Sequence, residues 1–353
     1  MNQVPSEWKE PIAQIISKAR TVMLVGGTDT GKTTFCTYLA AEALQQGRLV
    51  AVVDADIGQS EIGPPGCIGL GMPIQVPFRL SELKPRGLHF IGSTSPPGFL
   101  VECVTGVVRM TQRAKSLGAD FIVVDTTGLV RGYLGRKLKA AKFDALQPDI
   151  VAHLERPDEA ENTTSVFPPS KLLRIPVPDL VRIKTQEIRA LRRRAKLASY
   201  FREAREMDLQ LDKLIRRGTH LLTGRLIEPA ELQSLGRGLS SQLIHGELIR
   251  DWYYFISRGP AGEADIRTLA QRLNTEQFRL VNVARLIWLS TGLLDEDANT
   301  LAMGLVVHID FSTFRLRVIT PWLDAESVHG VSFGVMRAQP DGIELEPLKR
   351  GEI

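Results

Sequence analysis

The stretch GGTDTGKT, from Gly26 to Thr33, has residue types and a spacing that suit phosphate binding. It fits the pattern G-x-x-x-x-G-K-S/T, with a strand-like apolar run before it and a helix-like sequence after it. Backbone N–H groups of such a loop wrap nucleotide phosphates, Lys32 can reach the β and γ oxygens, and the Thr33 hydroxyl can bind Mg²⁺. A dinucleotide site is excluded, because Thr28 stands where G-x-G-x-x-G needs its second glycine. The sequence predicts a P-loop whose phosphate-binding residues are Gly26, Gly27, Thr28, Asp29, Thr30, Gly31, Lys32, Thr33 and Thr34.

Three aspartates are expected at the same edge of the sheet as this loop. Asp54 and Asp56 end the apolar run RLVAVVDAD, and Asp125 ends the run DFIVVD. Ligands of a parallel sheet bind at the carboxyl ends of strands, so these carboxylates can converge on one nucleotide. Alternation along a strand points Asp54 and Asp56 to one side, unless the turn begins before Asp56. For Asp54 a metal role and a turn role both stay open, whereas Gly58 and Gln59 extend the motif around Asp56 beyond turn chemistry.

A basic helix is expected from the stretch TQEIRALRRRAKLASYF, Thr185 to Phe201. Its helical periodicity places apolar residues on one face and basic residues on the other. The apolar face holds Ile188, Leu191, Ala195 and Ala198, and the basic face holds Arg189, Arg192, Arg193 and Lys196. Such a charge run is usually a solvated surface, so the pattern alone does not assign a function to it.

Length and composition indicate a globular protein of two domains: 353 residues, of which 43% are hydrophobic and 24% charged. The longest apolar runs fall far short of the roughly twenty residues of a membrane helix, and MNQVPSEWKEPIAQ is too polar for a signal peptide. We therefore expect no membrane segment and a cytoplasmic location. Three cysteines without C-x-x-C spacing and six scattered histidines favour neither a disulfide framework nor a zinc site. The net charge of +4 permits a nucleic-acid partner.

Three parts are expected along the chain: a helical segment over residues 1–20, an α/β domain over 21–205, and a β-rich domain over 206–353. In the second part apolar strands alternate with helices, which predicts a parallel sheet with helices on both faces. In the third part runs such as ELIRDWYYFIS, RLVNVARLIWLS and LAMGLVVHIDF are divided by Gly, Pro and Asp turns.

Four motifs in order, GGTDTGKTT, VDADIGQSEIGPPG, GSTSPPG and VDTTGLVRG, resemble those of the polynucleotide 5′-hydroxyl kinase family. This family includes RNA kinases of mRNA 3′-end formation, tRNA splicing and ribosomal RNA processing, with shorter archaeal and bacterial relatives. The resemblance implies a P-loop kinase that uses ATP and Mg²⁺ and phosphorylates RNA, with DNA as a further acceptor. It implies a site in which Asp56 is the general base and Lys32 stabilises charge, with metal contacts from Thr33, Asp54 and Asp125.

The same resemblance implies an acceptor site and a lid. A clasp that holds the acceptor phosphate matches Thr94, Ser95 and Pro96, and a D-T-x-G element matches Asp125 to Gly128. The expected substrate-binding residues are Gln59, Thr94, Ser95, Gly128 and Arg192. The basic helix corresponds to a lid that closes an arginine over the phosphates, for which we select Arg193 and Arg189 as catalytic, with Arg194 facing nucleic acid or solvent. Leu129 replaces an aromatic residue that stacks on the terminal base in some members.

Three alternatives to a polynucleotide kinase fit the sequence less well. A non-catalytic ATP-binding scaffold of an RNA-processing complex is disfavoured by the intact Lys32, Thr33 and Asp56. A switch GTPase needs an N-K-x-D motif, which PDIVAHLERPDE lacks. A small-molecule kinase leaves the open clasp and the basic lid unexplained. The sequence indicates no particular protein partner.

Overall fold

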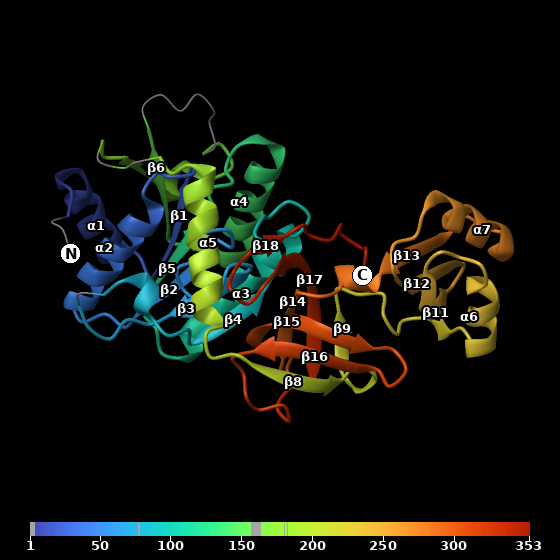
Figure 1. Ribbon diagram of the computed structural model, residues 1–353. Coiled ribbons are helices and arrows are strands. Elements are labelled where there is room, and N and C mark those ends of the chain that lie inside the picture. Colours follow the sequence, from blue (N-terminus) through green and yellow to red (C-terminus); the bar gives the residue numbers. More distant parts are fainter. Residues whose placement is uncertain (1–3, 77, 157–163, 180, 182) are drawn as a thin grey trace. The chain divides into compact units, whose positions relative to one another are not determined.

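The structure is a computed structural model that describes residues 4–76, 78–156, 164–179, 181 and 183–353 (Figure 1). The chain divides into two compact units, one up to Leu197 and the other from Ala198 to Ile353. None of the helices in the described ranges is long and apolar enough to cross a membrane.

The first unit alternates strands and helices. Its strands are β1 (Thr21–Gly26), β2 (Val50–Ala55), β3 (Cys67–Gly71), β4 (Gly87–Phe90), β5 (Phe121–Thr126), β6 (Ile150–Glu155) and β7 (Leu172–Pro176). Its helices are α1 (Ser6–Lys18), α2 (Lys32–Gln45), α3 (Leu100–Ser116), α4 (Gly132–Leu146) and α5 (Gln186–Tyr200), the last of which runs across the unit boundary. Two 3₁₀ turns, Leu80–Glu82 and Pro169–Lys171, complete it.

The seven strands form a sheet in the order β4-β3-β2-β5-β1-β6-β7. Strands β2, β5, β1, β6 and β7 are parallel, which confirms the α/β fold with a parallel-rich sheet. The sheet is mixed, however, because β3 runs antiparallel to both β2 and β4. Strand β3 was not predicted from the sequence, because its short CIGLG run carries too little pattern to be distinguished from the Pro and Gly residues around it.

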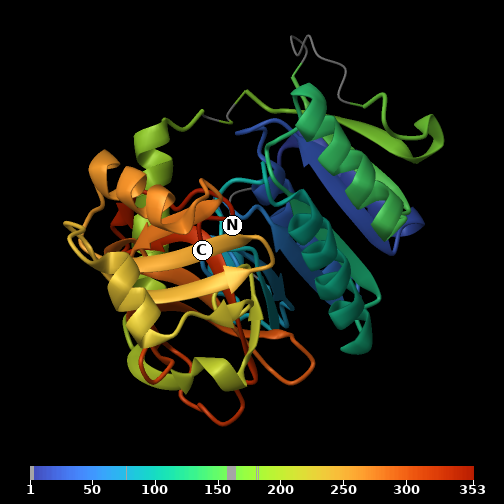
Figure 2. The same cartoon turned by 90° about the vertical axis from the view of Figure 1, so that its right-hand side faces the viewer.

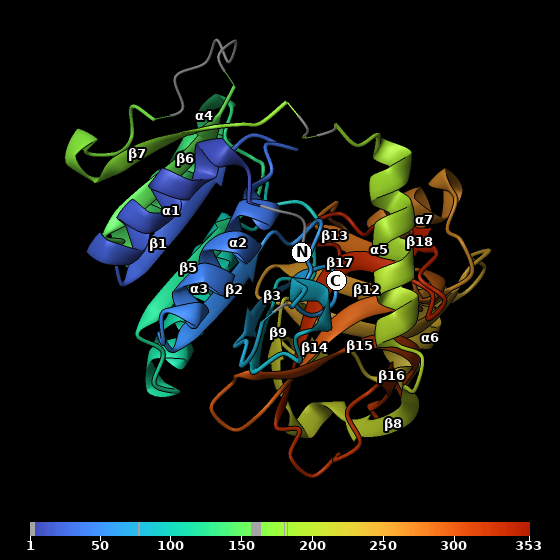
Figure 3. The same cartoon turned by 90° about the vertical axis from the view of Figure 1, so that its left-hand side faces the viewer.

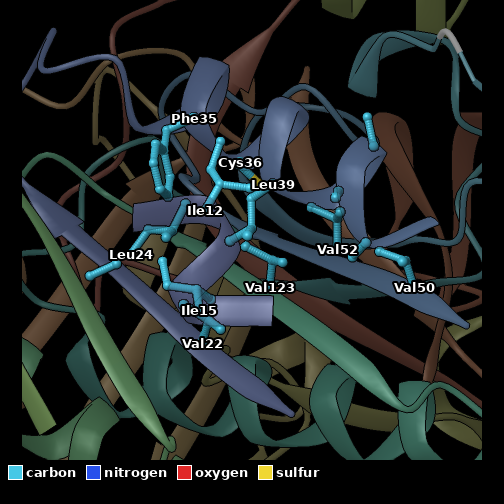
Figure 4. Close-up of a cluster of buried hydrophobic side chains, with 14 of the residues drawn as sticks. Ile12, Ile15, Val22, Leu24, Phe35, Cys36, Leu39, Val50, Val52 and Val123 are labelled. Atoms are coloured by element: carbon cyan, nitrogen blue, oxygen red, sulfur yellow. The ribbon is translucent and has the colours of Figure 1, made fainter. Parts of the chain in front are cut away.

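Helices cover both faces of this sheet because the strand residues alternate. Val50 and Val52 point toward α1 and α2, whereas Ala51 and Val53 belong to the cluster under α3 and α4. Figure 2 shows α3 and α4 together on one face, and Figure 3 shows α1 and α2 on the other. Figure 4 shows the cluster on the α1/α2 face, in which Ile12 and Ile15 meet strand and α2 side chains. Two buried faces make the central strands continuous apolar runs, as the sequence indicates.

The second unit contains two sheets. The larger follows the order β18-β17-β14-β15-β16-β8, with β9 paired to β17, and the smaller follows β10-β11-β12-β13. Their strands are β8 (Arg205–Gln210), β9 (Ile215–Arg217), β10 (Arg225–Leu226), β11 (Gln242–Ile249), β12 (Trp252–Arg258), β13 (Phe278–Asn282), β14 (Leu289–Leu294), β15 (Thr300–Asp310), β16 (Arg315–Thr320), β17 (Gly330–Ala338) and β18 (Glu344–Leu345). Two helices, α6 (Pro229–Gly236) and α7 (Glu263–Leu273), and 3₁₀ turns at Leu211–Lys213 and Val283–Arg285 complete it. This unit is rich in strands, but the sequence pattern did not predict its two helices.

Two expected single strands in this unit are pairs of strands. The run ELIRDWYYFIS turns at Arg250, and RLVNVARLIWLS divides into β13 and β14 before Trp288. Arg250 and Trp288 have φ angles of 55° and 64°, a left-handed conformation that bulky residues seldom adopt. Neither residue type indicates a turn, and Asp251 after Arg250 was the single turn-forming residue at the two places.

Candidate active site

The P-loop joins β1 to α2 at the carboxyl edge of the sheet. Gly31, with φ 83°, immediately precedes α2, and a Cβ there would also press on Trp8 and Val181 at 3.3–3.4 Å, so glycine is required. Lys32 is 6% exposed, and its Nζ donates to the Gly27 carbonyl at 2.7 Å. The Thr30 hydroxyl donates to the same carbonyl at 3.0 Å. These bonds fix the loop around the space expected for phosphates.

Asp125 and Thr33 form a matched pair at the adjoining strand end. The Thr33 hydroxyl donates to Asp125 Oδ2 at 2.6 Å, while the buried Oδ1 accepts no hydrogen bond from any described residue. Burial raises the pKa of the Asp125 carboxyl to about 6, although Lys32 and the Thr33 hydroxyl oppose the rise. An unsatisfied carboxylate oxygen beside a hydroxyl is the oxygen donor set that Mg²⁺ prefers, directly or through water. The residues present therefore fit a magnesium ion.

Asp54 is occupied by the loop that follows it. Its Oδ1 accepts the Asp56 N–H at 3.1 Å, and its Oδ2 accepts the N–H groups of Glu61 and Ile62, the latter at 2.9 Å. The side chain is 2% exposed, and burial, reinforced by the Asp125 charge, raises its pKa to about 8 against the effect of those N–H groups. Of the two roles left open for Asp54, this geometry favours loop organisation over metal binding.

Asp56 has a different environment because β2 ends at Ala55. Its Oδ1 accepts the N–H groups of Gly58 and Gln59, both at 3.2 Å, in a tight turn, and no described residue donates to its Oδ2. Because Asp56 lies in this turn and not in β2, strand alternation does not direct its side chain to the same side as that of Asp54. Within the described ranges, no three His, Cys, Asp or Glu side chains are grouped to hold a metal ion. Asp54 and Asp125 are register partners on neighbouring strands, and, besides burial, the charge of Asp56 raises the pKa of both, so the three carboxylates lie close enough to interact although they form no three-ligand metal cluster.

The expected acceptor segments lie against the P-loop and the Asp56 turn. A Cβ on Gly58 would come within 2.8 Å of the Thr94 carbonyl, and one on Gly128 within 2.5 Å of the Thr28 hydroxyl. These two glycines permit the clasp and the D-T-T-G loop to approach the phosphate-binding loop closely. Ser95 is exposed, and its N–H donates to the Ser93 hydroxyl at 3.1 Å.

A buried lysine, which the sequence analysis did not select, supports the D-T-T-G loop from below. Lys139 of α4 is 1% exposed, and its Nζ donates to the Thr126 hydroxyl at 2.7 Å and to the Thr127 carbonyl at 2.6 Å. Burial, and the neighbouring Lys142 charge, lower the pKa of Lys139 well below its ordinary range. No motif marks it, since its partners are thirteen and twelve residues away on another element.

The lid helix α5 is attached to both loops through polar contacts. Arg189 Nη2 donates to Asp29 Oδ2 at 2.6 Å, Gln59 Nε2 donates to the Arg189 carbonyl at 3.3 Å, and Lys196 Nζ donates to the Glu61 carbonyl at 2.6 Å. The basic face of the helix therefore faces the rest of the unit. Its other face is bare: Ile188 is 44% exposed and Leu191 is 63% exposed. Polar contacts attach the first part of this helix, and Leu197 near its end is fully buried.

A cavity of about 320 Å³ lies between the P-loop, the Asp56 turn and the first part of the lid helix. It is lined by Thr28, Asp29, Gly31, Lys32, Thr33, Thr34, Asp56, Gln59, Glu61, Lys184, Arg189 and Arg192. A neighbouring cavity of about 310 Å³ shares Gln59, Glu61 and Arg192 with it and also contacts Arg193 and Lys196. Of the two arginines selected as catalytic, Arg189 lines the first cavity and Arg193 the second. Glu61 and Lys184 line the first cavity as well; Glu61 lies within the motif VDADIGQSEIGPPG but was not selected, and Lys184 belongs to none of the four motifs.

Comparison with known proteins agrees with this arrangement. Residues 26–203 match the family model described as mRNA cleavage and polyadenylation factor CLP1 P-loop. The chain belongs to this family. The polyribonucleotide 5′-hydroxyl-kinase of Pyrococcus furiosus is 33% identical over 349 residues, covering 98% of this chain and 96% of that protein. The enzyme of the same name from Pyrococcus horikoshii is 32% identical over 351 residues, covering 99% and 95%.

A solved structure extends the likeness to the fold. The Clp1p chain of a Clp1p–Pcf11p complex superimposes with a TM-score of 0.59 at 15% identity, covering 93% of this chain and 76% of that chain. The family match confirms the P-loop kinase relationship that the four motifs indicated. Its matched range includes the P-loop, the Asp56 turn, the clasp and the lid helix.

Proposed function

We propose that this protein is an ATP- and Mg²⁺-dependent polynucleotide kinase that transfers the γ-phosphoryl group of ATP to the 5′-hydroxyl of RNA, with DNA as a second acceptor. One observation carries the proposal: the cavity that contains the P-loop Lys32 also contains Asp56, whose Oδ2 accepts no hydrogen bond from a described residue. A phosphate-binding lysine and a carboxylate that can accept a proton therefore line the same cavity. The archaeal relatives' name, polyribonucleotide 5′-hydroxyl-kinase, supports RNA as the acceptor.

The residues divide the reaction among them. Asp56 takes the proton of the acceptor's 5′-hydroxyl while the hydroxyl oxygen forms a bond to the γ-phosphorus of ATP. The bond between the γ-phosphorus and the oxygen that bridges it to the β-phosphorus breaks, which releases ADP. Lys32 exchanges the Gly27 carbonyl for phosphate oxygens, and the lid arginines offset the charge on the transferring group. Thr33 and Asp125 would hold Mg²⁺, which supplies charge neutralisation on the phosphates.

The acceptor enters from the side of the clasp. The Thr94 carbonyl lies against Gly58 of the Asp56 turn, and Ser95 follows it in the clasp. A clasp at this place suits the first internucleotide phosphate of a strand whose 5′ end reaches Asp56. Gln59 and Arg192 line both cavities, so Arg192 adds positive charge where the two meet, and Gly128 lies against Thr28 of the P-loop.

The test is an end-labelling assay with γ-labelled ATP and four acceptors: 5′-hydroxyl RNA, 5′-hydroxyl DNA, the same RNA carrying a 5′-phosphate, and free nucleosides. We expect label on the 5′-hydroxyl oligonucleotides and none on the 5′-phosphorylated RNA, with Lys32→Ala inactive because its charge at the β and γ oxygens is gone. Preferential labelling of nucleosides would replace the proposal with a small-molecule kinase. ATP binding without transfer to any acceptor would favour the scaffold.

A further inference from the structure

Asp29 is an unusual residue for a phosphate-binding loop. It is a carboxylate among backbone groups that are expected to surround anionic phosphates, and with φ 57° it adopts a left-handed conformation. An unpaired negative charge at this place would repel the nucleotide. Its side chain is only 6% exposed, so the carboxylate is directed into the protein and held there.

The contacts of Asp29 tie the loop to the start of the lid. Its Oδ2 accepts the Lys184 N–H at 2.8 Å and Arg189 Nη2 at 2.6 Å, while its own carbonyl accepts Arg156 Nη2 at 2.7 Å. Burial alone would raise the pKa of the Asp29 carboxyl, but the Lys184 N–H and the Arg189 guanidinium outweigh burial and lower it. One carboxylate therefore fixes both the backbone before α5 and the first arginine of that helix.

Arg189 keeps an unused donor beside the cavity. Its Nε is buried and has no hydrogen-bond partner among the described residues, and the side chain lines the cavity that also holds Lys32. A buried N–H without an acceptor is costly, and an acceptor bound in the adjoining cavity would remove that cost. A phosphate oxygen is the acceptor that the rest of the cavity is built to receive.

We infer that Asp29 is a positioning residue, which holds Arg189 by Nη2 so that its Nε points to the phosphates of ATP. The inference rests on the proposed function only in taking ATP as the anion. Asp29 itself does not contact the nucleotide through its side chain. Asp29 acts through Arg189. Before ATP binds, the Asp29 carboxylate balances the charge of the Arg189 guanidinium group, and the phosphates of bound ATP add further negative charge beside it.

The experiment measures the binding of ATP labelled on the ribose with a fluorophore, in the absence of any acceptor. Asp29→Asn keeps an oxygen for the Lys184 N–H and nearly the same size, but removes the ion pair. We expect Asp29→Asn and Arg189→Ala each to weaken binding by about tenfold, since a charge-assisted bond is involved in both. The double variant should bind no more weakly than Arg189→Ala alone, because both changes remove one interaction. Glu187→Gln, an exposed carboxylate on the same helix, is the control and should bind as the wild type does.

Two results would overturn the inference. Additive losses in the double variant would mean that Asp29 and Arg189 act independently. Tighter binding by Asp29→Asn would mean that the carboxylate competes with phosphate for Arg189 instead of orienting it. Thermal melting of each variant confirms that it is folded. Because no acceptor is present, coupling between the two residues supports the inference even if the end-labelling assay shows no transfer, so the two claims fail separately.

Discussion

Asp54 and Asp56 are two residues apart, yet they face different surroundings. Asp54 lies within β2, and N–H groups of the following loop donate to its carboxylate. Asp56 lies in the turn after β2 and lines the cavity. Both carboxylate oxygens of Asp54 accept backbone N–H groups of the loop. Only Oδ1 of Asp56 accepts such groups from the described residues, which leaves Oδ2 able to accept a proton. The division of labour depends on the strand ending at Ala55, one residue before alternation would have brought the two side chains together.

The buried position of Asp54 predicts a pH dependence of stability. Its pKa is raised to about 8 in the folded protein from an ordinary 3.8, so the folded state binds this proton more tightly than the unfolded state. The resulting stability is fully present below about pH 4 and is lost as the pH rises through about 8. Asp54→Asn cannot titrate and lacks this component. We expect the melting temperature of the wild type, relative to that of Asp54→Asn, to fall between about pH 5 and about pH 9. A difference that stays constant or increases with pH would contradict the assignment.

At the scale of elements, α4 supports the end of β5 through Lys139. The Lys139 amino group supplies donors to the Thr126 hydroxyl and the Thr127 carbonyl, so removing it leaves buried acceptors without a partner. We expect Lys139→Met to destabilise the unit that contains it by about 1–3 kcal/mol, the cost of an unsatisfied buried group. Lys137→Met, on an exposed position of the same helix, is the matched control and should change stability by about 0.5 kcal/mol or less. Urea unfolding measures the free energy of unfolding of both variants. Equal losses in the two would show that Lys139 does not stabilise the D-T-T-G loop.

The elements also show where sequence reasoning succeeds. The P-loop, its strand and its helix could be predicted because the pattern from Gly26 to Thr33 is local and its chemistry is specific. The pairing of Asp29 with Arg189 joins residues 160 positions apart, and no local pattern indicates it. The left-handed turns at Arg250 and Trp288 were missed because their residue types disfavour that conformation. Motif residues were thus predictable, and the residues that hold them in place were not.

At the scale of the whole molecule, positive charge is concentrated in the first unit. Up to Leu197 the chain has 26 Lys and Arg against 19 Asp and Glu, whereas from Ala198 it has 18 against 21. The unit that contains the P-loop and the lid is therefore the one suited to an anionic strand. The second unit, with a net negative charge, is not expected to supply most of the phosphate contacts.

This charge distribution predicts a salt-dependent acceptor affinity. Each phosphate contact releases counterions, so the logarithm of oligonucleotide affinity should fall linearly with the logarithm of salt concentration, by a slope of about 0.7 per contact for a single strand. Arg192→Ala should reduce that slope by about one contact, about 0.7, whereas Arg258→Ala, exposed in the second unit, should leave it unchanged. Titrations of a labelled 5′-hydroxyl RNA at several salt concentrations provide the measurement. An unchanged slope in Arg192→Ala would place the acceptor strand elsewhere.

The most direct test of the central claim, that the acceptor hydroxyl is activated at Asp56 opposite the P-loop, is single-turnover transfer by Asp56→Asn. The substitution keeps the shape of the side chain and removes the proton acceptor. With saturating ATP and 5′-hydroxyl RNA, the transfer rate should fall by about 10²-fold or more while ATP affinity changes little. A variant that binds ATP more weakly but transfers at the wild-type rate once saturated would contradict the claim, and Asp56 would then be a structural or metal-binding residue.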